Sequence, residues 1–428
     1  MELTRRTLLS GTAAAGAVTA LGASRLGPFR LSDATAATGL PAPAQSGIDH
    51  VVVVMMENRS FDHFLGWVPN ADGIQSGLTF RDRFGVPHST YHLQTYASCG
   101  HTDPDHSYEG GRIELDGGKD DGWLRAGEND LLAIGYYQSQ DLGFFSAAAP
   151  YWTTCDRYFA AVMAETYPNR FYQHSAQTDR LHNNTNQATI PTIWDRLSDA
   201  GLNGTYYFSD IPFTALWYDK YLSISKPYSQ FLSDCAAGTL PQVSFVDPRF
   251  EDEPSGTSGD DHPHADIRNG EKFLAEVYTA VTTSPAWGRT LLVVNYDEWG
   301  GFYDHVTPGT APDVSPTTAL RGFRVPALVI SPRARRHSVA HNVYDHTSVL
   351  KAIEWRWGLP PLTARDKNAR NIAEVLDFSK PADLTAPPIT VAPFVPEGPC
   401  GAPSSLPSSE EWAPLREVAL AHGWTLPS

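Results

Sequence analysis

The sequence VVVVMMEN, residues 51–58, places an unbroken run of apolar residues directly before Glu57 and Asn58. Four valines and two methionines in succession predict a strand that is buried on both faces, as in a parallel sheet. A buried strand that stops at a carboxylate carries that carboxylate to the carboxyl edge of the sheet, where ligands bind in open α/β folds. The stretch therefore predicts both a fold class and the position of a ligand site.

Further strand-like segments alternate with helical patterns along the chain. The strand-like segments are residues 203–210, 241–248, 290–299 and 325–332, and the helical patterns cover residues 265–287 and 346–358. This alternation predicts an α/β protein with a largely parallel sheet sandwiched by helices. Residues 67–150 are rich in Gly, His and Asp, and we expect a long irregular insertion near the active site there.

The ends of the chain differ from its middle. Arg5 and Arg6 precede a mildly apolar stretch of small residues, which predicts a twin-arginine export signal with cleavage after Ala36. The expected segments are a signal peptide at 1–36, a linker at 37–47, a catalytic domain at 48–379, and a Pro- and Ser-rich segment at 380–428 whose terminal helix packs on the domain. We therefore expect a secreted or cell-surface protein that uses the twin-arginine export machinery.

The chain of 428 residues carries a formal net charge of −16 at pH 7. Non-specific binding to nucleic acid requires basic patches, so this charge argues against nucleic acid as a partner. A protein that handles phosphate against such a charge needs a local positive source, such as a metal ion or clustered His and Arg.

Four cysteines are scattered without CxxC spacing, which excludes zinc-finger and redox motifs. They are Cys99, Cys155, Cys235 and Cys400. In an oxidising compartment they could form two disulfides in any of three connectivities, and free buried thiols are the alternative.

Polar pairs follow three of the predicted strands. The pairs are Glu57-Asn58, Asp297-Glu298 and Asp345-His346. Oxygen-rich clusters with an occasional histidine are the ligand set of hard or borderline divalent metals. One acidic strand end is commonly a solvated turn, but three in one α/β chain favour a common site. Gly300 and Gly301 would permit a tight turn and a close ligand approach.

The segment AETYPNRFYQHS, residues 164–175, places Thr166 before a Pro-Asn-Arg turn and an aromatic helical run. A threonine at such a turn is usually a helix N-cap. The alternative is a nucleophile beside a metal ion, since a neighbouring cation lowers the pKa of an oxygen acid. Asn169 would then donate to a phosphoryl oxygen, and Arg170 would either do the same or hold the loop through an ion pair.

Five histidines lie in loops rich in Gly, Asp and Pro. They are His101, His106, His262, His264 and His305. A lone histidine is more often structural, but a set of this kind favours function. Neutral histidine ligates metals, and protonated histidine donates to phosphate or to a leaving group.

Five motifs together resemble the bacterial phosphoesterase family of phospholipases C and acid phosphatases. The motifs are MMENRSFDHFLG, TYPNRFY, DDHPHADIRNGEKFL, YDEWGGFYDHV and YDHTSVLKAIEWRWGL, and they extend from residue 48 to about residue 360. The resemblance implies an alkaline-phosphatase-like fold and metal-dependent hydrolysis of a phosphate ester.

The resemblance also implies roles for single residues. The metal ligands would be Glu57, Asn58, Thr166, Asp297, Glu298, Asp345 and His346. Thr166 would also be the nucleophile, assisted by Asn169, His262 and His305, and the substrate would meet His101, His106, Arg170 and His264. The chain has DHPH where relatives often have DHPP, so His264 has no secure role in the family. Glu298 replaces a histidine of the wider superfamily, which favours calcium over zinc or manganese.

The expected activity is that of a phospholipase C. It would cleave a phosphatidylcholine-like lipid to diacylglycerol and a phosphorylated head group through a phosphothreonine intermediate, with peripheral contact to a membrane. The alternative is a secreted acid phosphatase or small-molecule phosphodiesterase with the same site. A sulfatase-like hydrolase would need Cys or Ser in place of Thr166, and an inactive surface-binding module would have lost one of the clusters.

Aromatic residues in and after the insertion give a weaker indication of a lipid substrate. They are Trp123, Tyr136, Tyr137, Phe144, Phe145, Tyr151 and Trp152. Rings with polar handles suit a surface that meets acyl chains and head groups. The alternative is that these rings pack the insertion.

Overall fold

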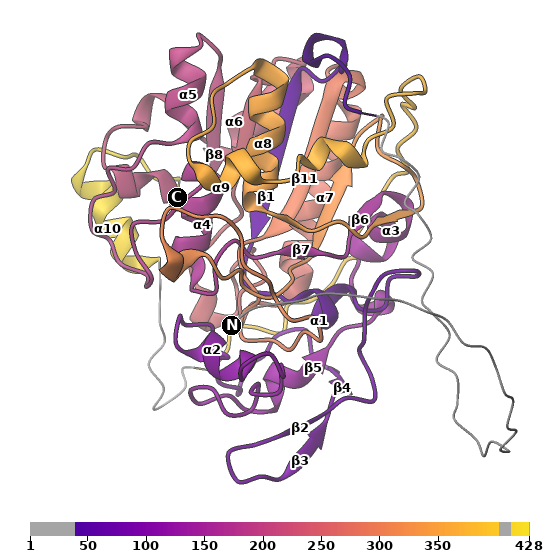
Figure 1. Ribbon diagram of the computed structural model, residues 1–428, viewed down its shortest axis with the longest axis vertical. Helices are drawn as coiled ribbons and strands as arrows, with labels where there is room; N and C mark the ends of the chain where they lie inside the picture. The colour runs from indigo at the N-terminus through magenta and orange to yellow at the C-terminus, as the bar shows by residue number, and fades with distance from the viewer. Residues whose placement is uncertain (1–38, 402–411, 428) are drawn as a thin grey trace, which may run out of the picture. The chain divides into compact units, whose positions relative to one another are not determined.

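A sheet of eight strands forms the centre of the chain over the residues that the structure describes (Figure 1). The computed structural model describes residues 39–401 and 412–427, so the predicted signal peptide and parts of the predicted linker and terminal segment lie outside these residues. The strand order is β13-β6-β12-β11-β1-β10-β8-β9. The strands are β1 (His50–Met56), β6 (Thr153–Cys155), β8 (Gly204–Phe208), β9 (Ser225–Pro227), β10 (Val243–Val246), β11 (Thr290–Tyr296), β12 (Ala327–Ile330) and β13 (Ser338–Ala340).

The centre of this sheet is parallel. Strand β1 pairs in parallel with β10 on one side and with β11 on the other, and β8 continues the parallel set beyond β10. Strand β12 runs antiparallel to both of its neighbours. The four valines of β1 are at most 1% exposed, as expected for a strand covered on both faces. The carboxyl ends of β11, β1 and β10 therefore lie side by side at one edge.

Helices cover both faces of the sheet. They are α1 (Phe61–Leu65), α2 (Gly110–Leu115), α3 (Phe145–Tyr151), α4 (Thr166–Ser175), α5 (Ile193–Asp199), α6 (Tyr228–Ala237), α7 (Ile267–Thr283), α8 (His346–Trp357), α9 (Ala364–Asn368) and α10 (Ala413–Ala421). Helix α4 packs against α8, and α6 packs against α7. In Figure 1, α8 lies in front of the sheet and α6 behind it. The predicted α/β class, with a largely parallel sheet between helices, is confirmed.

The long insertion contains short regular elements. They are the antiparallel hairpin β2 (Thr79–Arg81) and β3 (Pro87–Ser89) and the parallel pair β4 (Tyr91–His92) and β5 (Gly135–Tyr136). Strands β7 (Tyr158–Phe159) and β14 (Tyr344–Asp345) form another small parallel pair beside the main sheet. These pairs are too short to form a core of their own, so the insertion packs on the main domain.

The predicted lipid-facing surface of aromatic rings is wrong. Trp123, Phe144, Phe145 and Trp152 have no exposed surface, and Tyr136 and Tyr137 are also buried. Tyr151 is only partly exposed. The alternative interpretation is confirmed, because these rings are buried in the same hydrophobic core as the central sheet and so pack the insertion onto the domain.

One disulfide joins the insertion to the C-terminal segment. Cys99 is bonded to Cys400, whereas Cys155 and Cys235 are buried free thiols. The chain thus combines the two alternatives that the cysteine spacing left open.

The end of the chain returns to the domain as expected. Trp412, just before α10, stacks on Phe250 with ring centroids 3.8 Å apart, and α10 contacts residues 213–217. Among the residues that the structure describes, none of the helices has the length and apolar character needed to cross a membrane.

Candidate functional site

Two adjacent strand ends bring the first predicted pairs together. Met56 of β1 is in register with Tyr296 of β11, so the residues that follow, Glu57 and Asp297, leave the sheet side by side. The backbone N–H of Asn58 donates to Asp297 Oδ1 at 3.0 Å. Three of the predicted metal ligands thus occupy one edge of the sheet, because the strands that carry them are parallel neighbours.

A glycine permits this close approach. Asn58 has a positive φ of 56°, and Gly300 has a φ of 64°. A Cβ atom on Gly300 would lie 2.2 Å from the backbone oxygen of Asn58, which is well inside van der Waals contact. The turn after Asp297 therefore requires glycine so that two backbones can meet.

Thr166 joins this group from helix α4. Its hydroxyl donates to Glu57 Oε2 at 3.2 Å and lies 3.4 Å from Asn58 Oδ1. Thr166 is the first residue of the helix, and Glu165 occupies the N-cap position. The default reading of Thr166 as an N-cap is therefore wrong, and its buried hydroxyl faces the carboxylate cluster at the positive end of the helix dipole.

Arg170, one turn along α4, forms buried ion pairs with three carboxylates. Its guanidinium contacts Glu57, lies 3.2 Å from Asp247 Oδ1, and lies 3.8 Å from Asp297 Oδ2. A further N–H donates to the backbone oxygen of Met55 at 3.1 Å. These contacts support the ion-pair alternative for Arg170, since the side chain is 1% exposed and its charge is engaged.

The carboxylates around Arg170 outnumber it. Burial raises the pKa of Glu57 well above its usual range although Arg170 opposes the shift, and burial also raises the pKa of Asp247. Burial raises the pKa of the nearby Asp260 to about 7. Asp297 Oδ2 and Asp260 Oδ2 are buried without a hydrogen-bond partner. Excess buried negative charge with unsatisfied oxygens is the environment that an added cation stabilises.

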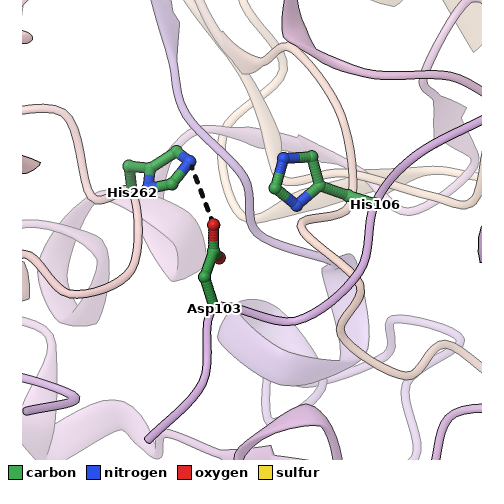
Figure 2. A group of neighbouring side chains, drawn as sticks. All are labelled: Asp103, His106 and His262. Carbon is green, nitrogen blue, oxygen red and sulfur yellow. Dashed lines mark ion pairs between the residues drawn. The ribbon is translucent and has the colours of Figure 1, made fainter. Parts of the chain in front are cut away.

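A second group of side chains lies next to Asn58. Asp103, His106 and His262 have potential ligand atoms that all lie within 4.8 Å of one another, and Figure 2 shows the three side chains pointing toward one another. His106 Nδ1 donates to the backbone oxygen of Pro104 at 2.8 Å, and its Nε2 lies 3.4 Å from Asn58 Nδ2. The cluster is thus continuous with the Glu57 group and could itself hold a metal ion.

The His262 ring is oriented by its own loop. Its Nδ1 donates to the backbone oxygen of Pro263, which leaves Nε2 directed toward Asp103 Oδ2 at 3.9 Å. Burial and the neighbouring His106 lower the pKa of His262 well below its usual value. The low pKa favours the neutral imidazole, and the contact of Nδ1 with the Pro263 oxygen favours Nε2 as the acceptor.

Glu298 lies between the two groups. Its Oε2 accepts the Gly300 N–H at 2.7 Å, and its Oε1 lies 4.0 Å from His106 Nε2. The structure therefore places this predicted metal ligand beside the histidine cluster.

Asp345 and His346 lie apart from both groups, and their role as metal ligands stays a prediction. Asp345 caps α8 and forms ion pairs with Arg321 at 2.7 Å and Arg365 at 3.0 Å. These two arginines hold the pKa of Asp345 well below its usual range, although burial opposes the shift. Because both charges come from the chain itself, this carboxylate needs no metal.

His346 has both ring nitrogens engaged by other groups. Its Nε2 donates to the backbone oxygen of Asp297 at 2.6 Å, and its Nδ1 lies 3.3 Å from the Tyr158 hydroxyl. Burial lowers its pKa to about 4. The ring therefore positions the Asp297 backbone.

His305 belongs to a separate buried network. It contacts Asp62 through Nδ1 at 2.5 Å and Asp72 through Nε2 at 3.2 Å. Asp62, Asp304 and His305 have the spacing of a metal site, but Arg324 lies among them, 2.8 Å from Asp304 Oδ1 and 3.2 Å from Asp62 Oδ1. A guanidinium already supplies positive charge there, and the catalytic role of His305 stays a prediction.

The remaining predicted residues hold loops. His101 pairs with Asp130 at 3.0 Å, a contact that raises the His101 pKa, and His264 donates to the His101 backbone oxygen at 2.8 Å. The Asn169 side chain makes four hydrogen bonds, all to the backbone of residues 162–165. Asn169 therefore shapes the turn before Thr166, and its role at the phosphoryl group stays a prediction.

Three residues of the site were missed in the sequence: Asp103, Asp247 and Asp260. Asp247 follows β10 in the segment VSFVDP, so it has the same strand-end signal as Glu57 and Asp297. Asp103 and Asp260 lie in loops within three residues of predicted histidines, and their place in the site depends on how those loops fold.

The chain belongs to the phosphoesterase family, which matches residues 48–360 and confirms the family expected from the motifs. Non-specific phospholipase C6 of Arabidopsis thaliana is 32% identical over 378 residues, covering 78% of this chain and 72% of that protein. Phospholipase C B of Mycobacterium tuberculosis (strain ATCC 25618 / H37Rv) is 30% identical over 433 residues, covering 81% of each. The protein is a phosphoric ester hydrolase.

This chain is also similar, more distantly, to solved structures. A protein in the alkaline phosphatase superfamily from Vibrio parahaemolyticus aligns with a TM-score of 0.39 and 9% identity, covering 78% of this chain and 71% of that chain.

The ion pairs of Arg170 generate a prediction about stability. Arg170→Met should lower the free energy of unfolding by roughly 3–5 kcal/mol, because it leaves buried carboxylates without their counter-charge. The matched control is Arg157→Met, which breaks an ion pair with Asp72 in which each side chain is 38% exposed. Its cost should be below about 1 kcal/mol. Urea unfolding measures both, and equal losses would contradict the assigned role of Arg170.

Proposed function

We propose that this phosphoesterase is a phospholipase C that cleaves a phosphatidylcholine-like lipid at the glycerol–phosphate bond. The observation that carries the proposal is the buried Thr166 hydroxyl, held by Glu57 and Asn58 at the carboxyl edge of the sheet. The names of the relatives support the phospholipid as substrate. The net charge of −16 favours a zwitterionic lipid over an anionic surface, which it would repel.

In this mechanism Thr166 is the nucleophile. Its Oγ1 forms the bond to phosphorus as the bond from phosphorus to the glycerol oxygen breaks. The proton of the Thr166 hydroxyl ends on the departing glycerol oxygen, so diacylglycerol is released and the head-group phosphate stays bonded to Thr166 as a phosphothreonine ester. Water then cleaves the phosphothreonine and restores the hydroxyl. The position of Thr166 at the start of α4 directs backbone N–H groups and the positive end of the helix dipole toward the phosphate.

The histidine cluster handles protons in the same mechanism. His262 is neutral and directs Nε2 toward Asp103, so it can take a proton from the attacking water, and Asp103 would then stabilise the charged ring. Nδ1 of His262 is held by its own backbone, which fixes the nitrogen that reacts.

A hard divalent cation fits the Glu57 group. The atoms that would hold it are oxygens of Glu57, Asn58, Thr166 and Asp297, and the buried Asp297 Oδ2 lacks a hydrogen-bond partner. Without His346 the donor set contains oxygen alone, which favours a hard ion such as calcium over zinc. When bound, such an ion polarises phosphoryl oxygens and stabilises developing negative charge.

Thr166 variants test the proposed nucleophile. Thr166→Ala should lower kcat by several orders of magnitude. Thr166→Ser keeps the hydroxyl and should retain a measurable kcat. Acid quenching of the wild type during turnover should trap phosphate on Thr166, detected by mass spectrometry. A Thr166→Ala protein with more than about a tenth of wild-type activity would exclude Thr166.

The substrate assay decides between the lipase and its alternative. The wild type should have a higher kcat/KM on phosphatidylcholine than on p-nitrophenyl phosphate. A preference for the monoester of about tenfold or more would replace the lipase proposal with the acid phosphatase, with Thr166 in the same role.

Metal removal tests the oxygen site against the histidine cluster. EGTA should inactivate the enzyme and calcium should restore it, and Asp297→Asn should lower the calcium content measured by elemental analysis, since an amide is a weaker ligand for a hard cation. The matched variant His262→Ala should leave the calcium content unchanged. Restoration by zinc alone, with loss of zinc in His262→Ala, would assign the ion to the Asp103, His106 and His262 cluster.

We also propose export through the twin-arginine route. The Cys99–Cys400 disulfide supports an oxidising compartment. Lysine at both Arg5 and Arg6 should retain the protein in the cytoplasm, as measured by cell fractionation, because export receptors read the arginine pair itself. Unchanged export of this double variant would refute the route.

A further inference from the structure

The hairpin β2–β3 presents a convex apolar tip. Phe84 is 85% exposed and Val86 is 49% exposed, the first value being among the highest for a large hydrophobic residue in the described chain. Arg81 and Arg83 are also exposed beside the tip. Figure 1 shows the hairpin extending away from the rest of the domain, below α1 and β5. An exposed ring of this kind, flanked by guanidinium groups, indicates a contact surface.

The base of the hairpin is anchored at the edge of the sheet that carries the candidate site. Phe80 is buried, and its ring centroid lies 5.9 Å from that of Tyr303. Tyr303 lies in the loop that follows β11, and its backbone oxygen accepts the Ser60 hydroxyl at 2.6 Å. Ser60 follows β1. The hairpin therefore leaves the domain from the two loops that also carry the carboxylates of the site.

A second contact places the hairpin beside the histidine cluster. Arg83 donates to the backbone oxygen of Gly127 at 2.7 Å. The next residue, Glu128, accepts the Thr102 hydroxyl at its backbone oxygen, 2.9 Å away. Thr102 directly precedes Asp103 of the candidate site. The tip is thus connected through one loop to the stretch that carries Asp103 and His106.

The tip is held in its exposed conformation. Asp82 Oδ1 accepts the backbone N–H groups of Phe84 and Val86, each at 2.9 Å, and Asp82 Oδ2 pairs with His88 at 3.0 Å. Gly85 has a φ of 80°, which closes the turn without strain. Because the turn is braced from within, the Phe84 ring is presented outward and not folded onto the hairpin.

We propose that this tip inserts into the surface of a phospholipid bilayer and brings the active-site edge to its substrate. The inference rests on the proposed phospholipase activity. A protein partner would need about 800 Å² on each side, which one short turn does not offer, whereas a lipid surface accepts a single ring without a matching pocket. Arg81 donates to the Gly85 backbone oxygen and places a guanidinium group beside the tip for lipid phosphate in a chain of net charge −16, whereas Arg83 is paired with Glu128.

Phe84→Asp in the full chain tests the inference. Binding to phosphatidylcholine vesicles, measured by co-sedimentation, and hydrolysis of vesicle lipid should each fall about tenfold, because a charge replaces the inserted ring. Hydrolysis of monomeric short-chain phosphatidylcholine should stay within about twofold of wild type, since the tip touches no residue of the site. Circular dichroism should show an unchanged fold, because Phe84 packs on nothing.

The matched control is Leu384→Asp. Leu384 is 60% exposed, and its backbone oxygen accepts the Trp287 indole N–H at 3.0 Å, just before β11 begins, so it lies at the opposite edge of the sheet. This variant should bind and hydrolyse vesicles as the wild type does.

The outcomes separate the inference from the proposed function. Equal vesicle binding by the two variants would overturn the membrane role of the tip. The same conclusion would follow if Phe84→Asp lowered the hydrolysis of monomeric lipid as much as that of vesicle lipid. Wild-type protein that binds vesicles but hydrolyses neither form of the lipid would overturn the phospholipase activity alone.

Discussion

The structure of this site depends on the Arg170 guanidinium, which is buried among Glu57, Asp247 and Asp297. Each of these acids follows a different parallel strand, and three neighbouring carboxylates would repel one another if nothing lay between them. The single arginine comes from α4 and so ties that helix to the edge of the sheet. Its position brings Thr166, one turn earlier, to Glu57 and Asn58. One ion-pair network therefore determines both the packing of the helix and the position of Thr166, the proposed nucleophile.

Two other buried arginines organise the surroundings in the same way. Arg324 lies between Asp62 and Asp304, which follow β1 and β11, and Arg365 pairs with Asp345 at the start of α8. These networks hold the loops on either side of the site without contributing to its chemistry. Around Thr166 the carboxylates outnumber Arg170, and the buried Asp297 Oδ2 and Asp260 Oδ2 have no hydrogen-bond partner, so this is where a cation would be stabilised.

The membrane contact and the chemistry occupy the same edge of the protein for a structural reason. Parallel strands send their following loops to one side, so the insertion that begins after β1 grows out of that side. Most aromatic side chains of the insertion are buried or partly buried by packing, and its one exposed ring is that of Phe84 at the tip of the β2–β3 hairpin. The disulfide from Cys99 to Cys400 fastens the base of the loop that leads to Asp103 and His106.

The sequence by itself determined the α/β class, the largely parallel character of the sheet and the family. It also indicated Glu57, Asn58, Thr166 and Asp297, because hydrophobic periodicity, strand ends and helix starts are local patterns. Only the tertiary structure decided which acids face an arginine and which face one another, since Arg324 and Arg365 come from distant parts of the chain. Asp345, His346 and His305 were therefore indistinguishable from ligands in the sequence, and Asp103 and Asp260 were missed. The burial of the insertion's aromatic rings could not be predicted for the same reason, because the pattern of residues shows that a ring is present but not what covers it.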